Sequence, residues 1–165
     1  MTIKIFTDGS CLGNPGSGGW AAIFNFDKEI KKFCGTAQNV TNNRMELLAV
    51  LKALEEIERI EIKRKKHNSY IIYCDSAYVV NSIVNKWIDT WIENGWKTKK
   101  KESVKNKDLW LRILTKQNFF DKNKINVQFK KVKGHSGDVF NELADKIANE
   151  QATNAKKNFK EKKKK

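Results

Sequence analysis

The chain has 165 residues, with 33 Lys or Arg against 19 Asp or Glu, so its formal net charge is +14. The length suits one compact domain. Because its apolar runs are only strand-length, the sequence excludes a membrane-spanning helix and a signal peptide and indicates a cytoplasmic protein. Three cysteines without CxxC spacing indicate reduced thiols rather than a disulfide framework or a zinc site. So positive a field favours a polyanionic partner, although charge alone does not establish nucleic-acid binding.

The positive charge is densest at the C-terminal end. Residues 156–165 hold seven Lys and one Glu, a net +6, which leaves +8 for the rest of the chain. A lysine block of this kind cannot bury enough apolar surface to fold. We therefore expect a folded domain at residues 1–152 and a lysine-rich, disordered tail at residues 153–165.

Three strands are predicted at the start of the chain. Residues 2–7 alternate between polar and apolar and stop at Asp8, which is thus expected at a strand end, before a Gly/Pro/Asn-rich stretch that reaches Gly19. Residues 20–26 and 29–34 read as two further strands joined by a short turn. Together the three segments predict an antiparallel meander.

Helices and strands alternate in the rest of the chain. Apolar residues recur at helical spacing in residues 43–60, which predicts an amphipathic helix. A short strand at residues 69–74 ends at Asp75, and a broadly helical segment follows at residues 78–92. A last strand at residues 125–132 precedes a helix at residues 138–148. This order predicts an α/β domain with helices packed on a five-stranded mixed sheet.

Four acids stand out because each lies in a different predicted element: Asp8, Glu46, Asp75 and Asp145. Side chains at strand ends can converge on a crevice beside the sheet. Carboxylates gathered there repel one another, and hard divalent cations such as Mg²⁺ or Mn²⁺ relieve that repulsion. Each acid alone also has an ordinary interpretation, as a turn former, a helix-capping partner or a solvated helix residue.

The sequence around these acids resembles the ribonuclease H family, specifically the small type 1 enzymes of bacteria. The resemblance covers about residues 2–150. Each matching block is weak, but their order and spacing are specific. The blocks are Phe6-Thr7-Asp8-Gly9-Ser10 with Gly13-Asn14-Pro15-Gly16, Thr41-Asn42-Asn43-Arg44-Met45-Glu46-Leu47, Asp75-Ser76 with Tyr78-Val79, Gly95-Trp96-Lys97-Thr98, Val104-Lys105-Asn106, and Val132-Lys133-Gly134-His135-Ser136-Gly137 with Asn141-Glu142 and Asp145.

The resemblance implies a ribonuclease H-like fold, a catalytic domain at residues 1–152 and hydrolysis of the RNA strand of RNA–DNA hybrids. In that family pattern the four acids bind two Mg²⁺ ions, with Mn²⁺ as a possible substitute, and the products carry 5′-phosphate and 3′-hydroxyl ends. His135 would assist proton transfer or product departure, for which an imidazole has a suitable pKa. No protein partner is implied, and a monomer is expected.

The resemblance also assigns contacts with the hybrid. Residues 86–107 interleave tryptophans with lysines and resemble the basic protrusion of the type 1 enzymes, a surface suited to a phosphate backbone. Trp87 and Trp91 lie four residues apart, and at least one of them is expected in the core. The residues expected to contact the substrate are Cys11, Asn14, Asn42 and Asn43 near the hybrid, Thr41 and Asn106 in a phosphate pocket, and Trp87, Trp96 and Lys97 in the protrusion.

Two departures from the family pattern leave the fine substrate contacts open. Ala77 stands where some relatives carry Gln or Met, and one extra residue lies between Asp75 and Trp87. Two alternatives also stay open: an inactive nucleic-acid-binding module on the same fold, and the nuclease portion of a reverse transcriptase. The presence of all four acids and His135 favours an active enzyme, and the start at Met1 without a polymerase favours a free-standing one.

Overall fold

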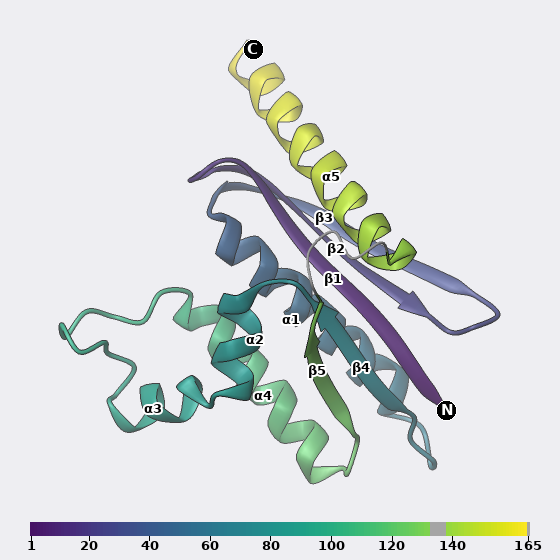
Figure 1. The fold of residues 1–165 in the computed structure, drawn as a ribbon. Coiled ribbons are helices and arrows are strands. Elements are labelled where there is room, and N and C mark those ends of the chain that lie inside the picture. The colour runs from purple at the N-terminus through teal and green to yellow at the C-terminus, as the bar shows by residue number, and fades with distance from the viewer. Residues whose placement is uncertain (133–137, 165) are drawn as a thin grey trace.

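A computed structural model describes residues 1–132 and 138–164. Its centre is a five-stranded mixed sheet with the strand order β3-β2-β1-β4-β5. The first three strands are antiparallel neighbours, whereas β4 and β5 run parallel to β1. The α/β architecture with helices on a five-stranded mixed sheet is therefore confirmed (Figure 1). The strands are β1 Thr2–Gly13, β2 Gly16–Asn25, β3 Ile30–Val40, β4 Ser69–Cys74 and β5 Val127–Lys131.

The first strand is longer than its sequence pattern predicts. β1 pairs with β2 from Lys4↔Asn25 as far as Gly13↔Gly16, so the expectation that Asp8 ends a strand is wrong. The reason is that the Gly-rich stretch supplies the partner strand instead of a long loop. The parallel pairing of β1 with β4 does stop at Thr7↔Cys74. Asp8 therefore lies in the middle of a strand but just beyond the end of the parallel ladder.

The two long helices cover opposite faces of the sheet (Figure 1). The first, α1, spans Asn42–Glu61 and begins at Thr41, whose side chain accepts a hydrogen bond from the backbone N–H of Arg44. Close approach of α1 to β1 depends on Gly9, where a Cβ would lie 2.3 Å from the backbone nitrogen of Glu46. On the other face α5, Val139–Lys163, packs equally closely on β2 at Gly19. Glycines thus let both helices lie directly on the strands.

The segment after β4 forms three helices, α2 Ala77–Val84, α3 Trp87–Glu93 and α4 Lys107–Lys122. The prediction of one helical segment at residues 78–92 is wrong in detail. Lys86 adopts a left-handed backbone with φ 55° and separates α2 from α3. Helix α4 is absent from the elements expected from the sequence, although its Trp110 and Ile113 are fully buried in the core. Among the described residues, no helix combines the length and the apolar character that crossing a bilayer requires.

The C-terminal end differs most from expectation. Residues 153–163 are not a disordered tail but continue α5, which ends at Lys163. Ala152 and Ala155 are buried against the sheet, and the Gln38 side chain donates a hydrogen bond of 2.6 Å to the carbonyl oxygen of Ala155. Residues 156–164, beyond that point, are exposed. Because Ala, Lys, Glu and Gln are strong helix formers, a helix already anchored by packing extends through this segment.

Candidate active site

The four predicted acids come together at the end of the β1–β4 parallel ladder. Asp8 and Asp75 follow the last paired residues of β1 and β4, Thr7 and Cys74. Glu46 reaches the same place from the first turns of α1, and Asp145 comes from α5 on the opposite face. Asp8 interacts with each of the other three carboxyl groups. The four acids expected to converge from different elements thus do meet in one cluster, although Asp8 lies within β1 rather than at its end.

Asp8 lies at the centre of this cluster. Asp8 is only 5% exposed, and its Oδ1 accepts a hydrogen bond of 2.8 Å from the N–H of Gly9. Burial, the negative charge of Asp75 and a hydrogen bond with Asp145 raise the pKa of Asp8 to about 7, against the opposing hydrogen bonds of Glu46 and Gly9. Without a cation, Asp8 therefore holds a proton over much of the acidic and neutral pH range.

Glu46 is as buried as Asp8, at 5% exposed. Burial, followed by the charge of Asp8, raises the pKa of Glu46 well above its ordinary value. Its Oε2 atom is inaccessible and has no hydrogen-bond partner among the residues that the structure describes. A buried carboxylate oxygen without a partner is unfavourable. A divalent cation facing this oxygen would supply the missing partner.

The donor set fits divalent cations. Ligand atoms of Glu46, Cys74 and Asp75 all lie within 4.8 Å of one another, and Asp8 interacts directly with both acids of this group. Carboxylate oxygens are the ligands that Mg²⁺ and Mn²⁺ prefer. The thiol of Cys74 is fully buried, and burial raises its pKa, so it is a poor ligand for a hard cation. The residues present therefore suit a magnesium site made of carboxylates.

The predicted histidine cannot be placed beside these acids. His135 belongs to residues 133–137, which lie outside the described part of the chain. Its role in proton transfer or product departure stays a prediction. His67, the other histidine, pairs with Glu61 through its Nδ1 at 2.6 Å, at the far end of α1 from Glu46.

A separate surface pocket gathers most of the predicted substrate residues. Its lining consists of Asn14, Thr41, Asn42, Asn43, Tyr78, Lys105 and Asn106. The N-termini of α1 and α4 both lie here, because Thr41 and Asn106 are their capping residues. Helix N-termini offer unpaired N–H groups and a partial positive charge, which favour a phosphate group. The structure thus brings the predicted phosphate-pocket residues Thr41 and Asn106 together.

Two side chains that the sequence analysis gave no role hold this pocket in shape. Arg44 donates hydrogen bonds to Asn106 at 3.2 Å and to both carboxylate oxygens of Asp108 at 3.0 and 2.6 Å. The hydroxyl of Tyr78 accepts from the Asn106 amide at 3.3 Å and from the Trp110 ring N–H at 3.0 Å. These contacts fix Asn106, whose own backbone is left-handed with φ 61°. Arg44 and Tyr78 both stand within the matching sequence blocks, which is the signal that could have identified them.

The remaining predicted contact residues are placed unevenly. Cys11 is half-buried, and its Sγ lies 2.6 and 2.9 Å from the carbonyl oxygens of Gly13 and Val40. Its single S–H donates to one of them at a time, so the thiol is already engaged within the fold. Asn14 accepts a hydrogen bond of 3.1 Å from the N–H of Asn42, which joins the β1–β2 turn to α1. The bond between Asn14 and Asn42 holds this wall of the pocket in place, so the Asn14 side-chain oxygen is already occupied within the fold.

The basic protrusion is anchored by its tryptophans. Trp91 packs on Trp110 and Trp96, with ring centroids 5.6 and 6.2 Å apart. Trp91 is half-buried and packs against the core, so the expectation of a core tryptophan holds only in part. Trp96 is half-buried at the base of the protrusion, whereas Trp87 is 42% exposed. Lys97 is exposed and pairs with Ser103 in an isolated β-bridge. Trp87 and Lys97 are accordingly more available to a ligand than Trp96.

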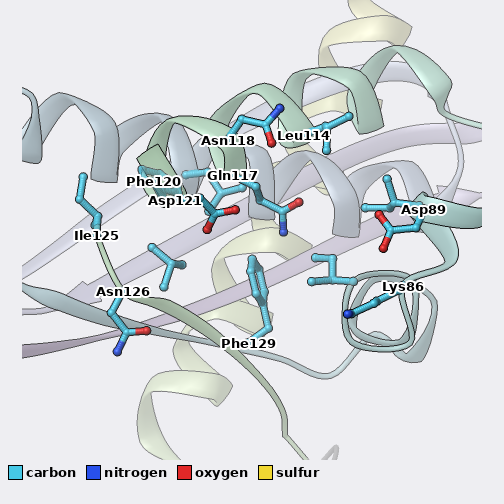
Figure 2. A pocket seen from close by; sticks show the side chains of 14 residues that line it. Lys86, Asp89, Leu114, Gln117, Asn118, Phe120, Asp121, Ile125, Asn126 and Phe129 are labelled. Carbon is cyan, nitrogen blue, oxygen red and sulfur yellow. The ribbon is translucent and has the colours of Figure 1, made fainter. Parts of the chain in front are cut away.

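Another pocket lies away from all four acids. It is enclosed by α3, α4 and β5, with Leu114, Phe120 and Phe129 among its apolar walls and Gln117 and Asn126 among its polar residues (Figure 2). None of the acidic cluster lines it. Asp8 and Asp75 lie instead at the end of the parallel ladder between β1 and β4, two inner strands of the sheet.

Comparisons with known proteins agree on one family. The model of the RNase H family matches residues 1–153. Ribonuclease H from Oleidesulfovibrio alaskensis is 47% identical over 146 residues, which cover 88% of this chain and 87% of that protein. Ribonuclease H from Syntrophomonas wolfei is 44% identical over 148 residues, covering 88% and 92% of the two chains.

Solved structures show the same fold. LC9-RNase H1, described as a type 1 RNase H with the type 2 active-site motif, is 25% identical with a TM-score of 0.74, over 93% of this chain and 73% of that one. LC11-RNase H1 in complex with RNA/DNA hybrid has a TM-score of 0.68 at 21% identity, over 93% and 98% of the two chains. Sequence, fold and the converging acids lead to one conclusion: the chain belongs to the ribonuclease H family.

Proposed function

We propose that this protein is a metal-dependent endoribonuclease that hydrolyses the RNA strand of RNA–DNA hybrids and leaves 5′-phosphate and 3′-hydroxyl ends. Two observations carry the proposal: three acids converge on Asp8, and the buried Oε2 of Glu46, one of the three, lacks a partner among the described residues. The relatives named ribonuclease H and the LC11 enzyme bound to RNA/DNA hybrid support the choice of substrate.

In this proposal Asp8, Glu46, Asp75 and Asp145 hold two Mg²⁺ ions, with Mn²⁺ as a possible substitute. When bound, the two ions supply a nucleophile at neutral pH and stabilise charge on the leaving 3′ oxygen. The task of the carboxylates is geometric. Asp8 and Asp75 are fixed by the sheet, and Glu46 and Asp145 are fixed by helices packed on its two faces. A rigid cluster of this kind limits reorganisation during the reaction.

The pocket at the N-termini of α1 and α4 would bind a phosphate of the hybrid away from the cleaved bond. Thr41 and Asn106 contribute polar side chains there, and Lys105 contributes positive charge. Asn14, Asn42 and Asn43 line the same pocket, and amide groups can contact the sugar–phosphate backbone in a shallow groove, where the 2′-hydroxyl distinguishes RNA from DNA. The protrusion, with Trp87, Trp96 and Lys97, would follow the backbone further along.

His135 would carry protons or assist product departure, as a residue of near-neutral pKa can. One chain supplies all four acids and the phosphate pocket, so the proposal requires no protein partner and is compatible with a monomer.

The test is cleavage of three end-labelled duplexes, namely an RNA–DNA hybrid, duplex RNA and duplex DNA, with and without Mg²⁺. We expect cleavage of the hybrid only, in its RNA strand and only with Mg²⁺. Asp75→Asn is the inactive control, and Asp121→Asn, which changes an acid outside the cluster, is the matched active control. Hybrid binding without cleavage by the unmodified protein would instead indicate an inactive binding module and contradict the proposal.

A further inference from the structure

The last part of α5 is a helical arm that leaves the body of the protein. Ala155 is the last buried residue of α5, and residues 156–164 are all exposed. Figure 1 shows the yellow end of the helix projecting beyond the sheet. We call residues 156–164 the basic arm; it carries six Lys and one Glu, a net charge of +5.

The arm is held in direction by the packed part of the same helix. At Gly19 a Cβ would lie 2.4 Å from the carbonyl oxygen of Ala148 and 2.5 Å from the nitrogen of Ala152, which shows how closely α5 lies on β2. Lysines in the last turn are favourable to the helix dipole. The Lys163 ammonium group lies 4.6 Å from the centre of the Phe159 ring. The helix can therefore propagate into the arm without a new nucleation step.

One side of the arm continues the helix face that carries the catalytic candidate Asp145. Asn149 donates a hydrogen bond of 3.4 Å to Asp145 and accepts one of 2.5 Å from the Ser10 hydroxyl, so this face borders the acidic cluster. With about 3.6 residues per turn, Lys156, Lys160 and Lys163 return to within roughly 60° of the direction of Asp145. The other three lysines of the arm, Lys157, Lys162 and Lys164, point elsewhere.

The distances match a duplex. At about 1.5 Å per residue, Lys156 and Lys163 lie roughly 16 and 27 Å from Asp145 along the helix axis. Duplex DNA rises by about 3.4 Å per base pair and an A-like hybrid rises by less, so these lysines would lie roughly five to ten base pairs from the acidic cluster. Three ammonium groups on one side of a rigid rod are complementary to the phosphates of a duplex strand.

We propose that Lys156, Lys160 and Lys163 form a positioned contact with the phosphate backbone of the RNA–DNA hybrid, several base pairs from the cleaved bond. This inference rests on the proposed function and extends it, because it adds a substrate surface outside the protrusion and the phosphate pocket. The arm acts as a rigid support for charges, and its contribution depends on helical direction as well as on charge.

Two triple variants separate position from charge. The first triple variant removes the three positive charges on the side of the arm that faces the same way as Asp145; it combines Lys156→Ala, Lys160→Ala and Lys163→Ala. Lys157→Ala, Lys162→Ala and Lys164→Ala remove the same charge from the other sides. A third variant, Asn158→Pro, keeps every lysine but interrupts the arm, since proline is incompatible with a helix interior. Circular dichroism and thermal unfolding check that the domain of each variant stays folded.

The measurement is hybrid affinity by fluorescence anisotropy without divalent metal, over a salt series, with hairpin hybrids of about 6 and 16 base pairs. On the longer stem we expect the first triple variant and Asn158→Pro to weaken binding about tenfold, and the second triple variant less than about threefold. On the shorter stem all variants should bind alike. Equal losses from both triple variants, together with an unaffected Asn158→Pro, would overturn the proposal and indicate diffuse attraction.

Cleavage of the same hybrids with Mg²⁺ distinguishes the two proposals. If the variants and the unmodified protein cut the short hybrid equally but also bind the long one equally, the arm proposal fails and the proposed function stands. If the unmodified protein neither binds nor cuts the hybrids, the proposed function fails, and the arm proposal fails with it.

Discussion

Asp8 and Asp75 occupy equivalent places on neighbouring strands, because each directly follows the last pair of the parallel ladder, Thr7↔Cys74. This relationship explains how two acids distant in sequence face the same ligand. It also explains why the negative charge of Asp75 raises the pKa of Asp8 after the larger effect of burial. The cluster is therefore under electrostatic strain when no cation is bound.

We predict that Asp8→Asn abolishes cleavage, with a loss of at least about a thousandfold, while hybrid binding is largely retained. The metal-free variant should also be more stable than the unmodified protein at neutral pH. The folded-state pKa of Asp8, about 7, lies above its ordinary 3.8, so the folded protein holds the proton more tightly than the unfolded chain. Stability from this group is thus complete below about pH 4 and is lost as the pH rises toward 7.

Urea unfolding in EDTA between pH 4 and pH 7.5 measures this effect. The advantage of Asp8→Asn should grow with pH over that window, and added Mg²⁺ should stabilise the unmodified protein more than the variant. Substantial Mg²⁺-dependent turnover by the purified variant would refute a role of Asp8 in holding the metal.

His135→Ala should be milder than loss of an acid. The carboxylates would still hold the cations, and water can replace a proton carrier slowly. We expect a fall in kcat of about ten- to a thousandfold, with activity still detectable. His67→Ala is the control, since His67 contacts Glu61 rather than the acidic cluster. A His135 variant as inactive as Asp8→Asn, or indistinguishable from the unmodified enzyme, would show that the assigned role is wrong.

A second buried acid should control stability at low pH. The Glu61 side chain is fully buried and accepts hydrogen bonds from the hydroxyl of Tyr70 and from Asn68, while His67 pairs with it. Burial alone raises the pKa of Glu61, but the hydrogen bonds from Tyr70, His67 and Asn68 together outweigh it, and the pKa is lowered. Stability from this group is thus present above its ordinary pKa of 4.5 and is lost as the pH falls through the lowered value.

Replacing Glu61 by Gln should therefore cost about 1.5–3 kcal/mol of the free energy of unfolding at neutral pH and less below pH 4. Urea unfolding at several pH values measures this. The control is Glu56→Gln, which changes an acid of α1 that pairs with surface Arg59. An unchanged cost from pH 7 to pH 3 would mean that the charge of Glu61 is not what stabilises this end of α1.

The sequence predicts the chemistry of the site better than the extent of its elements. The strand before Asp75 has the predicted bounds, because residues 69–74 form a short apolar run with a sharp end. The length of β1 beyond Asp8 depends on pairing with β2, which local alternation does not reveal. Likewise, the lysine content of residues 156–163 taken alone predicts disorder. These residues are helical because the buried residues Ala148, Ala152 and Ala155 anchor the same helix, and local composition does not reveal that packing. Long-range packing decided each difference.

The last prediction concerns Arg44, which acts through Asn106 rather than on the acidic cluster. Its guanidinium group holds both Asn106 and Asp108, and Tyr78 holds Asn106 from the other side. Arg44→Ala should therefore loosen the phosphate pocket without moving the carboxylates, so that KM rises about three- to tenfold and kcat changes less than about twofold. Arg44→Lys should restore little, because an ammonium group cannot make the paired contacts of a guanidinium.

Arg59→Ala is the matched control, since this arginine of the same helix pairs with Glu56 at 2.5 Å and is not part of the pocket. Steady-state kinetics on one hybrid, with thermal unfolding of each variant, measures the outcome. A fall in kcat with unchanged KM would contradict the positioning role, and equal effects of Arg44→Ala and Arg59→Ala would reduce it to a general effect of lost positive charge.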